Sequence, residues 1–187
     1  MLSLGIKMPL LRRLWAAKKI LLFIFILNGC SQKTAPQITF KSIAGEIIQP
    51  SNYQNDVIVV NFWSTTCVSC IQKMPKLIDT YQRFKHDNFK LFAVAMSYDR
   101  PDYVLHFTQK HQLPFYVVLD LNGTIAQQYN QVKVTPTTFL VAPNGRIIQE
   151  HIGDIDMNAL TREIEKLIQS SSEKKHSTHT KNTTHSN

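Results

Sequence analysis

The sequence predicts an α/β protein in which helices flank both faces of a central mixed sheet, with an extra β-hairpin on its N-terminal side. Residues 56–62 and 89–96 are apolar at most positions, which is typical of strands that are buried on both faces. The segment between them has helical spacing, so we expect the two strands to pair in parallel through a right-handed crossover. Towards the C-terminus, Asn144-Gly145 separates two strand-like runs and predicts an antiparallel hairpin.

Two short strand-like pieces come first in the expected domain. Residues 38–40 and 46–48 flank Gly45, and this arrangement predicts a hairpin laid on one edge of the sheet. After the first long strand, apolar residues recur at helical spacing over 68–84. Pro75 lies inside this helix and cannot donate a backbone hydrogen bond, so we expect the helix to bend there.

The second half of the domain alternates further helices and strands. A helix is expected over 101–111, with Asp99 as its N-cap, and the run at 115–119 is the next strand. A short helix over 124–129 follows. The remaining elements are two strands and a closing amphipathic helix, over 134–141, 146–149 and 156–169.

The N-terminal segment, residues 1–29, is typical of an export signal. It carries five Lys and Arg residues and no acidic residue, and the apolar block 20–27 follows these charges near its end. A helix needs about 20 apolar residues to span a bilayer, so this block fits the core of a signal peptide better than a membrane span. Leu-Asn-Gly-Cys at 27–30 resembles the lipobox of bacterial lipoproteins, which makes Cys30 the predicted site of lipid attachment.

The chain therefore divides into four predicted parts: a lipoprotein-type signal peptide (1–29), a tether (30–36), the α/β domain (37–169) and a disordered polar tail (170–187). Two alternatives remain open for the start of the chain, an uncleaved anchor and an ordinary signal peptide that contains Cys30 by chance. A lipidated protein would lie on the periplasmic side of a bacterial membrane, with the inner and outer membranes both open.

The formal net charge of +8 does not indicate a nucleic-acid-binding protein. Five of the positive charges belong to residues 1–29, and the rest of the chain holds 16 basic and 13 acidic residues. Its basic residues are scattered, whereas nucleic-acid-binding domains gather them on one face or stripe. We therefore expect no nucleic-acid partner.

The chemistry of the chain is concentrated in Cys67 and Cys70, a C-x-x-C pair that follows the first long strand and opens the predicted helix. Free N–H groups and the helix dipole at a helix N-terminus stabilise a thiolate, which is the form that attacks disulfides. Three cysteines cannot form a four-cysteine zinc site, and we predict no metal site. A purely structural disulfide is the main alternative, but one that closes so short a loop stabilises a fold little.

Four motifs together carry a resemblance to a known family. They are Asn61-Phe62-Trp63, Cys67-Val68-Ser69-Cys70, Met74-Pro75 and Val134-Thr135-Pro136-Thr137-Thr138-Phe139. With them, residues 37–169 resemble the thioredoxin superfamily, and within it the TlpA-like and ResA-like membrane-tethered thiol-disulfide oxidoreductases of bacteria. The resemblance implies a three-layer thioredoxin-like fold, and a redox-active Cys67–Cys70 disulfide with no bound cofactor.

The resemblance also implies roles for individual residues. Pro136 would be a cis-proline facing the dithiol, so that the Thr135 backbone can pair with an extended substrate. Cys67 would attack a substrate disulfide as the nucleophile, and Cys70 would be the resolving cysteine that releases the reduced product. Trp63 is a further candidate for substrate contact, with core packing as its alternative.

The chain departs from the family pattern around the dithiol. Asn61 stands where cytoplasmic thioredoxins have a buried aspartate, so that proton-transfer group is missing. Thr66 and Ser69 replace the aromatic residue and the proline that are common before the two cysteines. Lys73 holds the place of a glutamate in ResA-like reductases, and its positive charge is expected to favour the Cys67 thiolate. Asn61 and Lys73 are therefore the residues predicted to tune the thiol pKa.

The sequence thus predicts an exported, membrane-anchored thiol-disulfide oxidoreductase that exchanges disulfides with envelope proteins, more as a reductase than as an oxidant. The resemblance implies apocytochrome c and a transmembrane thiol electron donor as partners. Two alternatives stay open, a thiol peroxidase of the peroxiredoxin type and a non-catalytic metal chaperone of the SCO type. Against the first, the residues before Cys67 lack the peroxiredoxin Pro and Thr. Against the second, SCO-like proteins pair a C-x-x-x-C motif with a distal histidine, whereas this dithiol is C-x-x-C and His151 is only a distant candidate.

Overall fold

The computed structural model describes residues 33–182, with side chains as far as Glu173, and a five-stranded sheet lies at the centre of this region. The strands are β3 (Val57–Trp63), β4 (Phe89–Ala95), β5 (Tyr116–Leu119), β6 (Thr137–Val141) and β7 (Ile147–Ile152). Their order across the sheet is β5-β4-β3-β6-β7. β3, β4 and β5 are parallel, whereas β6 and β7 join antiparallel, so the sheet is mixed as the sequence predicts.

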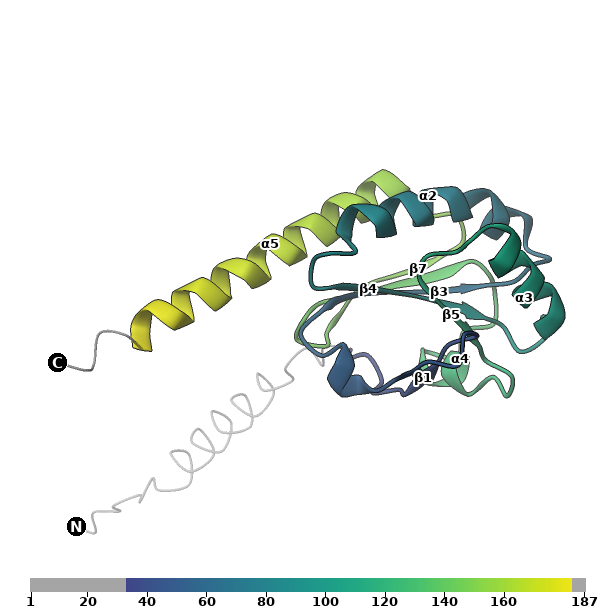
Figure 1. The fold of residues 1–187 in the computed structure, drawn as a ribbon, viewed down its shortest axis with the longest axis horizontal. Coiled ribbons are helices and arrows are strands. Elements are labelled where there is room, and N and C mark those ends of the chain that lie inside the picture. Colours follow the sequence, from purple (N-terminus) through teal and green to yellow (C-terminus); the bar gives the residue numbers. More distant parts are fainter. Residues whose placement is uncertain (1–32, 183–187) are drawn as a thin grey trace, which may run out of the picture. The chain divides into compact units, whose positions relative to one another are not determined.

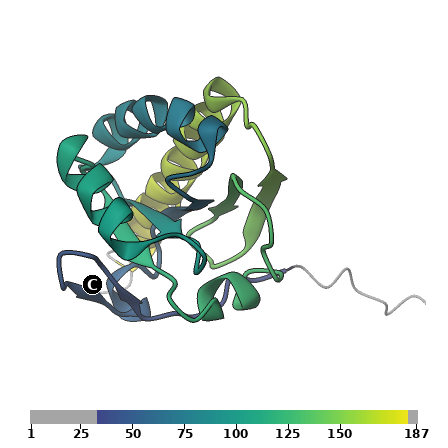
Figure 2. The same cartoon turned by 90° about the vertical axis from the view of Figure 1, so that its right-hand side faces the viewer.

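Helices cover one face of the sheet, and a hairpin with a short helix covers the other (Figure 1 and Figure 2). The first face carries α2 (Val68–Phe84), α3 (Pro101–Lys110) and α5 (Met157–Asn182). The second carries β1 (Phe40–Lys41), β2 (Ile47–Ile48), the 3₁₀ helix η2 (Pro50–Asn52) and α4 (Thr124–Gln128). Each outer layer closes its own apolar core against the sheet. The predicted three-layer α/β fold is confirmed.

The central strand β3 contributes to both cores. All seven of its residues are buried, because it is paired on both sides and covered on both faces. Alternate side chains point to opposite faces. The set that packs under α2 and α5 is Val57, Val59 and Trp63, and the opposite set is Ile58, Val60 and Phe62. Asn61 is in register with the first set, so its side chain points towards α2 near the carboxyl end of the strand.

The segment that precedes β3 covers part of both sheet edges. β1 and β2 form the predicted hairpin, and it attaches to the β5 edge, where Ser42 bridges to Val118. At the opposite edge, Thr34 bridges to Arg146, and the Ala35 N–H donates to the Gly145 carbonyl. The last residues of the predicted tether are therefore paired with the start of β7.

The closing helix is longer than expected. It was predicted to end near residue 169, but α5 continues to Asn182, so the predicted start of the tail falls inside the helix. A helix that has already started gains one hydrogen bond for each residue added. In addition, the hydroxyls of Ser170, Ser171 and Ser172 donate to carbonyls one turn earlier.

The predicted signal peptide (1–29) and the predicted lipid attachment site, Cys30, lie outside the described residues. Within residues 33–182, no helix is both long and apolar enough to cross a membrane. The division of the chain into four parts stays a prediction.

Candidate active site

Cys67 and Cys70 form a disulfide at the N-terminal end of α2, with 2.07 Å between the sulfurs and 5.2 Å between the Cα atoms. Cys67 is the N-cap of the helix, and its Sγ accepts a hydrogen bond of 3.2 Å from the Cys70 backbone N–H. After reduction the same N–H can stabilise a Cys67 thiolate, since hydrogen bonds to charged groups are the stronger ones. Cys67 is partly exposed and Cys70 is buried, so a substrate reaches Cys67 first.

A short turn carries the chain from β3 to Cys67. The Cys67 N–H donates to the Ser64 carbonyl, and the hydroxyls of Ser64 and Thr66 share a hydrogen bond of 2.9 Å. Asp99 holds the turn from the neighbouring loop. Its carboxylate accepts one hydrogen bond from the Thr65 N–H and one from the Thr65 hydroxyl, both 2.6 Å long.

Asp99, expected as the N-cap of the second helix, therefore has a different role. The N-cap of α3 is Arg100, and the Asp99 side chain is buried against the turn before Cys67. The sequence contains a signal for this position. Asp99 comes shortly after β4, and the carboxyl ends of neighbouring parallel strands such as β3 and β4 meet at the same edge of a sheet.

A small cavity lies behind the disulfide, on the side of Cys70. Residues from four parts of the chain line it, among them Asn61, Cys70, Lys73, Pro136, Thr138 and Ile155. The Thr135–Pro136 peptide bond is cis, in agreement with the expectation from the sequence. The cavity thus brings Asn61, Lys73 and Pro136 together with the resolving cysteine.

Asn61 is buried on the sheet side of this cavity. Its Nδ2 donates to the Thr138 hydroxyl at 2.9 Å, across the β3–β6 pair. An amide is neutral and hydrogen-bonds without exchanging a proton. The sheet therefore offers Cys70 a polar neighbour but no acid or base at this position, and the predicted effect of Asn61 on the thiol pKa stays a prediction.

Lys73 is held by the loop between β7 and α5. Its Nζ lies 2.7 Å from Oδ1 of Asp154 and donates to the Ile155 carbonyl at 3.2 Å. The Lys73 side chain is 23% exposed and that of Asp154 is 62% exposed, so solvent screens the pair on one side. Asp154 is a site residue that the sequence does not indicate, because the pairing joins this loop to a helix much earlier in the chain.

The cis-proline loop is tied to two neighbours. The Thr135 hydroxyl lies 3.3 Å from the Tyr98 hydroxyl, and the Pro136 carbonyl accepts a hydrogen bond of 2.8 Å from the Gly153 N–H. Thr135 is partly exposed, whereas Pro136 is buried. Pairing of the Thr135 backbone with a substrate stays a prediction.

Trp63 is a core residue, which corrects the expected contact between its side chain and a substrate. It has no exposed surface, and its ring packs on Phe107 of α3 with 5.3 Å between the centroids. The pleat of β3 directs the side chain into the core under the helices and away from the surface that surrounds Cys67. Its buried Nε1–H finds no hydrogen-bond partner among residues 33–182.

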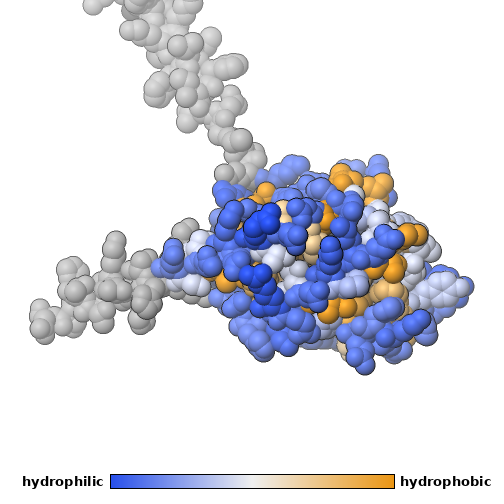
Figure 3. All heavy atoms as spheres, turned by 90° about the horizontal axis from the view of Figure 1, so that it is seen from above, coloured by the Kyte–Doolittle hydropathy of each residue, from blue (hydrophilic) through white to orange (hydrophobic). Residues whose placement is uncertain are grey.

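Exposed apolar side chains occur around the disulfide. Val68 follows Cys67 and is 71% exposed, and Val134 precedes the cis-proline loop and is 52% exposed. Tyr98, which contacts this loop, and Ile152, at the end of β7, are 58% and 63% exposed. We call these four residues the apolar rim. Figure 3 shows the apolar surface of one face gathered mainly towards its right-hand end. Surfaces of this kind favour contact with apolar groups of a partner.

His151, the remote candidate for a metal ligand, is engaged by the same loop that holds Lys73. Its Nε2 lies 3.1 Å from the Asp154 carbonyl oxygen. Within the described part of the chain, no three His, Cys, Asp or Glu side chains come together as a metal site.

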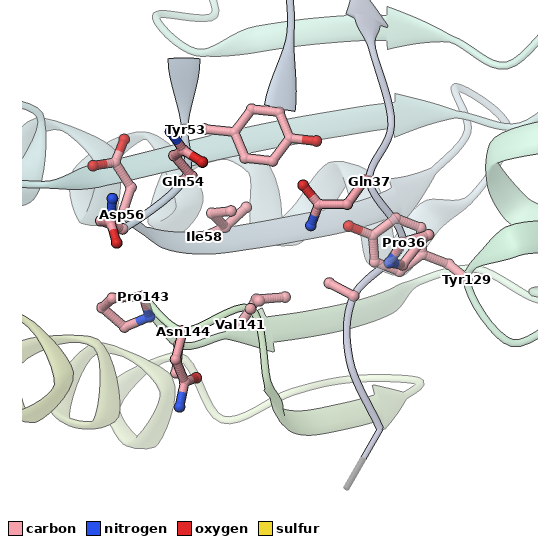
Figure 4. Close-up of a pocket in the computed structure, with 14 residues that line it drawn as sticks. Pro36, Gln37, Tyr53, Gln54, Asp56, Ile58, Tyr129, Val141, Pro143 and Asn144 are labelled. Atoms are coloured by element: carbon pink, nitrogen blue, oxygen red, sulfur yellow. The ribbon is translucent and has the colours of Figure 1, made fainter. Parts of the chain in front are cut away.

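A second hollow lies at the other end of β3, away from the disulfide (Figure 4). Its walls include Tyr53, Asp56, Ile58 and Tyr129, which Figure 4 labels. Burial, with a contribution from Tyr53, raises the pKa of Tyr129 above its ordinary value of 10.0. None of the predicted site residues within 33–182 lines this hollow.

Comparison with known proteins agrees with the geometry of the site. The family model described as the AhpC/TSA family matches residues 31–150. The thiol-disulfide oxidoreductase ResA of Bacillus thuringiensis is 28% identical over 136 residues, which cover 72% of this chain and 77% of that protein. The thiol-disulfide oxidoreductase ResA of Oceanobacillus iheyensis is 30% identical over 131 residues, which cover 67% of each chain.

The fold has relatives among solved structures as well. The crystal structure of StoA from Bacillus subtilis superimposes with a TM-score of 0.60 at 27% sequence identity. The match covers 68% of this chain and 95% of that chain.

Proposed function

This chain belongs to the AhpC/TSA family and is a thiol-disulfide oxidoreductase of the thioredoxin fold, and we propose that it acts as an exported, membrane-anchored reductase of disulfides in envelope proteins. The observation that carries the proposal is the Cys67–Cys70 disulfide at the N-terminus of α2, beside the cis-proline Pro136. A reachable sulfur followed by a buried one suits an exchange in two steps.

Each step exchanges one sulfur for another. In the reduced protein the Cys67 thiolate attacks a substrate disulfide, a Cys67–substrate bond forms, and the other substrate sulfur leaves as a thiolate that takes a proton from water. The Cys70 thiolate then attacks Cys67 Sγ, which re-forms the intramolecular disulfide and releases the second substrate sulfur. The two electrons that the substrate gains come from the two thiols of the protein.

The apolar rim and the Thr135 backbone are the proposed docking surface. A partner that presents an extended segment can pair its backbone with that of Thr135 and lay apolar side chains on Val134 and Ile152. Main-chain pairing is tolerant of sequence, so such a site accepts a class of unfolded or extended cysteine-containing segments. Apocytochrome c belongs to this class, and we propose it as one substrate.

The proposed direction of exchange requires a source of electrons. A dithiol donor in the membrane would reduce the Cys67–Cys70 disulfide after each cycle by the same two exchanges run in reverse. The signal-peptide pattern of residues 1–29 and the lipobox-like sequence that ends at Cys30 support a location on the periplasmic side of a bacterial membrane.

Trapping of mixed disulfides tests the exchange function. In full-length Cys70→Ala the second step is blocked, so envelope proteins are expected to accumulate as disulfides with Cys67 that mass spectrometry identifies. The Cys67→Ala/Cys70→Ala double variant is the matched control and should trap nothing. An empty trap, together with peroxide sensitivity of cells that lack the protein, would favour the thiol peroxidase instead.

The mass of the mature N-terminus tests the proposed anchor separately. A lipidated Cys30 is expected at the first position of the mature chain, and Cys30→Ala should leave the protein unlipidated. An unmodified mature N-terminus would contradict membrane anchoring and leave the exchange chemistry untouched.

A further inference from the structure

The cavity behind the disulfide places a positive charge on the side of Cys70. Among the described residues, Cys70 and Lys73 are the titratable groups that line it, and the polar neighbours Asn61 and Thr138 are neutral. Lys73 is therefore next to the resolving cysteine, whereas Cys67 lies at the surface of the helix end and is not part of the lining.

The second step of exchange requires a Cys70 thiolate, which the positive charge of Lys73 can stabilise. Cys70 attacks as a thiolate, but a buried thiol, here 3% exposed, gives up its proton less readily than one in water. Asn61 cannot take that proton. Cys67 has a separate source of stabilisation in the Cys70 backbone N–H, so its activation does not depend on the cavity.

We propose that Lys73 is the counter-charge of the Cys70 thiolate and that the carboxylate of Asp154 offsets part of that charge. The proposal rests on the reductase direction, in which Cys70 closes the ring. It replaces the expectation from the sequence, in which the charge of Lys73 acts on Cys67. Lys73 and Cys70 line the same cavity, the bond to the Ile155 carbonyl holds the ammonium in place, and the 2.7 Å ion pair with Asp154 neutralises part of its charge.

Several other charged groups surround this lysine. Asp154 neutralises part of its charge, and Asp156, at the start of α5, interacts with both Lys73 and Arg162. His151 of β7 contacts the Asp154 carbonyl. The field at Cys70 is thus a balance between one cation in the cavity lining and carboxylates in the β7–α5 loop, so changes at Lys73 and at Asp154 should have opposite effects.

The step balances without any further reactant. The Cys70 thiol loses its proton to water, its sulfur attacks Cys67 Sγ, and the Cys67–substrate bond breaks. The substrate sulfur leaves with the bonding electron pair and takes a proton from water. Lys73 contributes its charge to this step and does not act as an acid.

The first measurement is the pKa of Cys70 in full-length protein that carries Cys30→Ser and Cys67→Ser. The ultraviolet absorbance of the Cys70 thiolate is recorded as the pH is raised. Lys73→Met in this background is expected to raise the midpoint by about one unit, the lower end of the effect of a nearby opposite charge. Asp154→Asn is expected to lower it. Lys76→Met removes an exposed lysine on the same helix and serves as the matched control, with no shift expected.

The second measurement separates the two steps of exchange. A chromogenic aromatic disulfide releases one coloured thiolate when Cys67 attacks and another when Cys70 closes the ring. A rise of one pKa unit lowers the thiolate fraction tenfold but makes the remaining thiolate about threefold more nucleophilic, so Lys73→Met should slow ring closure about threefold near neutral pH. The first release should change less than the second.

Two results would overturn the proposal. One is an unchanged Cys70 midpoint in both Lys73→Met and Asp154→Asn, and the other is a slowed first release with an unchanged ring closure. Failure of the proposed function looks different. The unmodified protein would then still release colour from the small disulfide, but the Cys70→Ala variant would trap no envelope protein.

Discussion

The carboxylate of Asp99 accepts two hydrogen bonds from Thr65, one from the backbone N–H and one from the side-chain hydroxyl, both 2.6 Å long. The two residues are 34 positions apart in the chain, and they connect the loop after β4 to the turn that presents Cys67. Asp99 also accepts a hydrogen bond from the Arg100 N–H. A buried carboxylate with three donors is therefore part of the support for the nucleophile.

Removal of this support should loosen the turn. Asp99→Ala breaks two hydrogen bonds from Thr65 to a charged group, each of which contributes about 1.5–3 kcal/mol, and we expect the free energy of unfolding to fall by about 3 kcal/mol or more. The alkylation rate of reduced Cys67 should fall as well, because the turn no longer holds it at the helix end. Urea unfolding and thiol alkylation check the two effects.

Asp102→Ala is the matched control. Asp102 pairs with Arg100 at the surface, where an ion pair contributes little to stability. Equal unfolding curves for Asp99→Ala and the unmodified protein would show that the bonds to Thr65 are not needed.

The apolar rim should matter for protein substrates more than for small ones. Val134→Ser and Ile152→Ser each remove apolar surface that a docked segment would cover, at a cost of about 1 kcal/mol. This corresponds to about a fivefold rise in KM for a protein disulfide. Ile47→Ser, on the β1–β2 hairpin, removes an equally exposed side chain remote from Cys67 and is the control. A rise in KM of the same size in all three variants would argue against docking on the rim.

Trp63 carries an unpaired donor in the core, and this leads to an unusual expectation. Trp63→Phe leaves a cavity but removes a buried N–H without a partner among residues 33–182, and an unpaired buried donor costs about 1–3 kcal/mol. We expect the free energy of unfolding of Trp63→Phe to lie within about 1 kcal/mol of that of the unmodified protein, whereas Trp63→Ala should lower it by about 3–5 kcal/mol. Denaturant unfolding of both variants decides, and a large loss in Trp63→Phe would contradict the expectation.

The sequence predicts the layers of this fold well, because the signals that define them are local. The apolar run of β3 indicates burial on both faces, and the C-x-x-C pair that follows it marks the start of α2. The predicted cis-proline comes from a motif of a few residues and is present in the structure. These features depend on neighbours in the chain.

The partners of the site residues depend on distant parts of the chain, and the sequence does not reveal them. Lys73 bonds to the Ile155 carbonyl across 82 positions, so its sequence neighbours say nothing of the loop that holds it. Trp63 shows a second limit. Its place beside the dithiol motif suggests a surface role, but the alternation of side chains along β3 places Trp63 in the core. Side chains alternate between the two faces only as far as the strand continues, and β3 continues through Trp63. Its last residue is therefore still directed into the core.

Buried tyrosines should make the protein sensitive to alkali. Burial raises the pKa of Tyr129 above 10.0. Burial is also the largest cause of the raised pKa values of Tyr53, Tyr81 and Tyr116. The unfolded chain then loses these protons at a lower pH than the folded chain. The stability due to these groups is therefore fully present below pH 10.0 and is lost as the pH rises further.

Tyr129→Phe isolates the largest of these contributions. Phenylalanine keeps the ring contacts with Phe62 and Phe139, whose centroids lie 5.6 Å and 5.0 Å away, and has no proton to lose. Above pH 10.0 the free energy of unfolding of the unmodified protein should fall faster than that of Tyr129→Phe, by up to about 1.4 kcal/mol for each pH unit. Urea unfolding at a series of alkaline pH values measures both slopes, and the comparison at neutral pH corrects for any change in packing. Parallel curves for the two proteins would mean that Tyr129 ionises as readily in the folded chain as in the unfolded one.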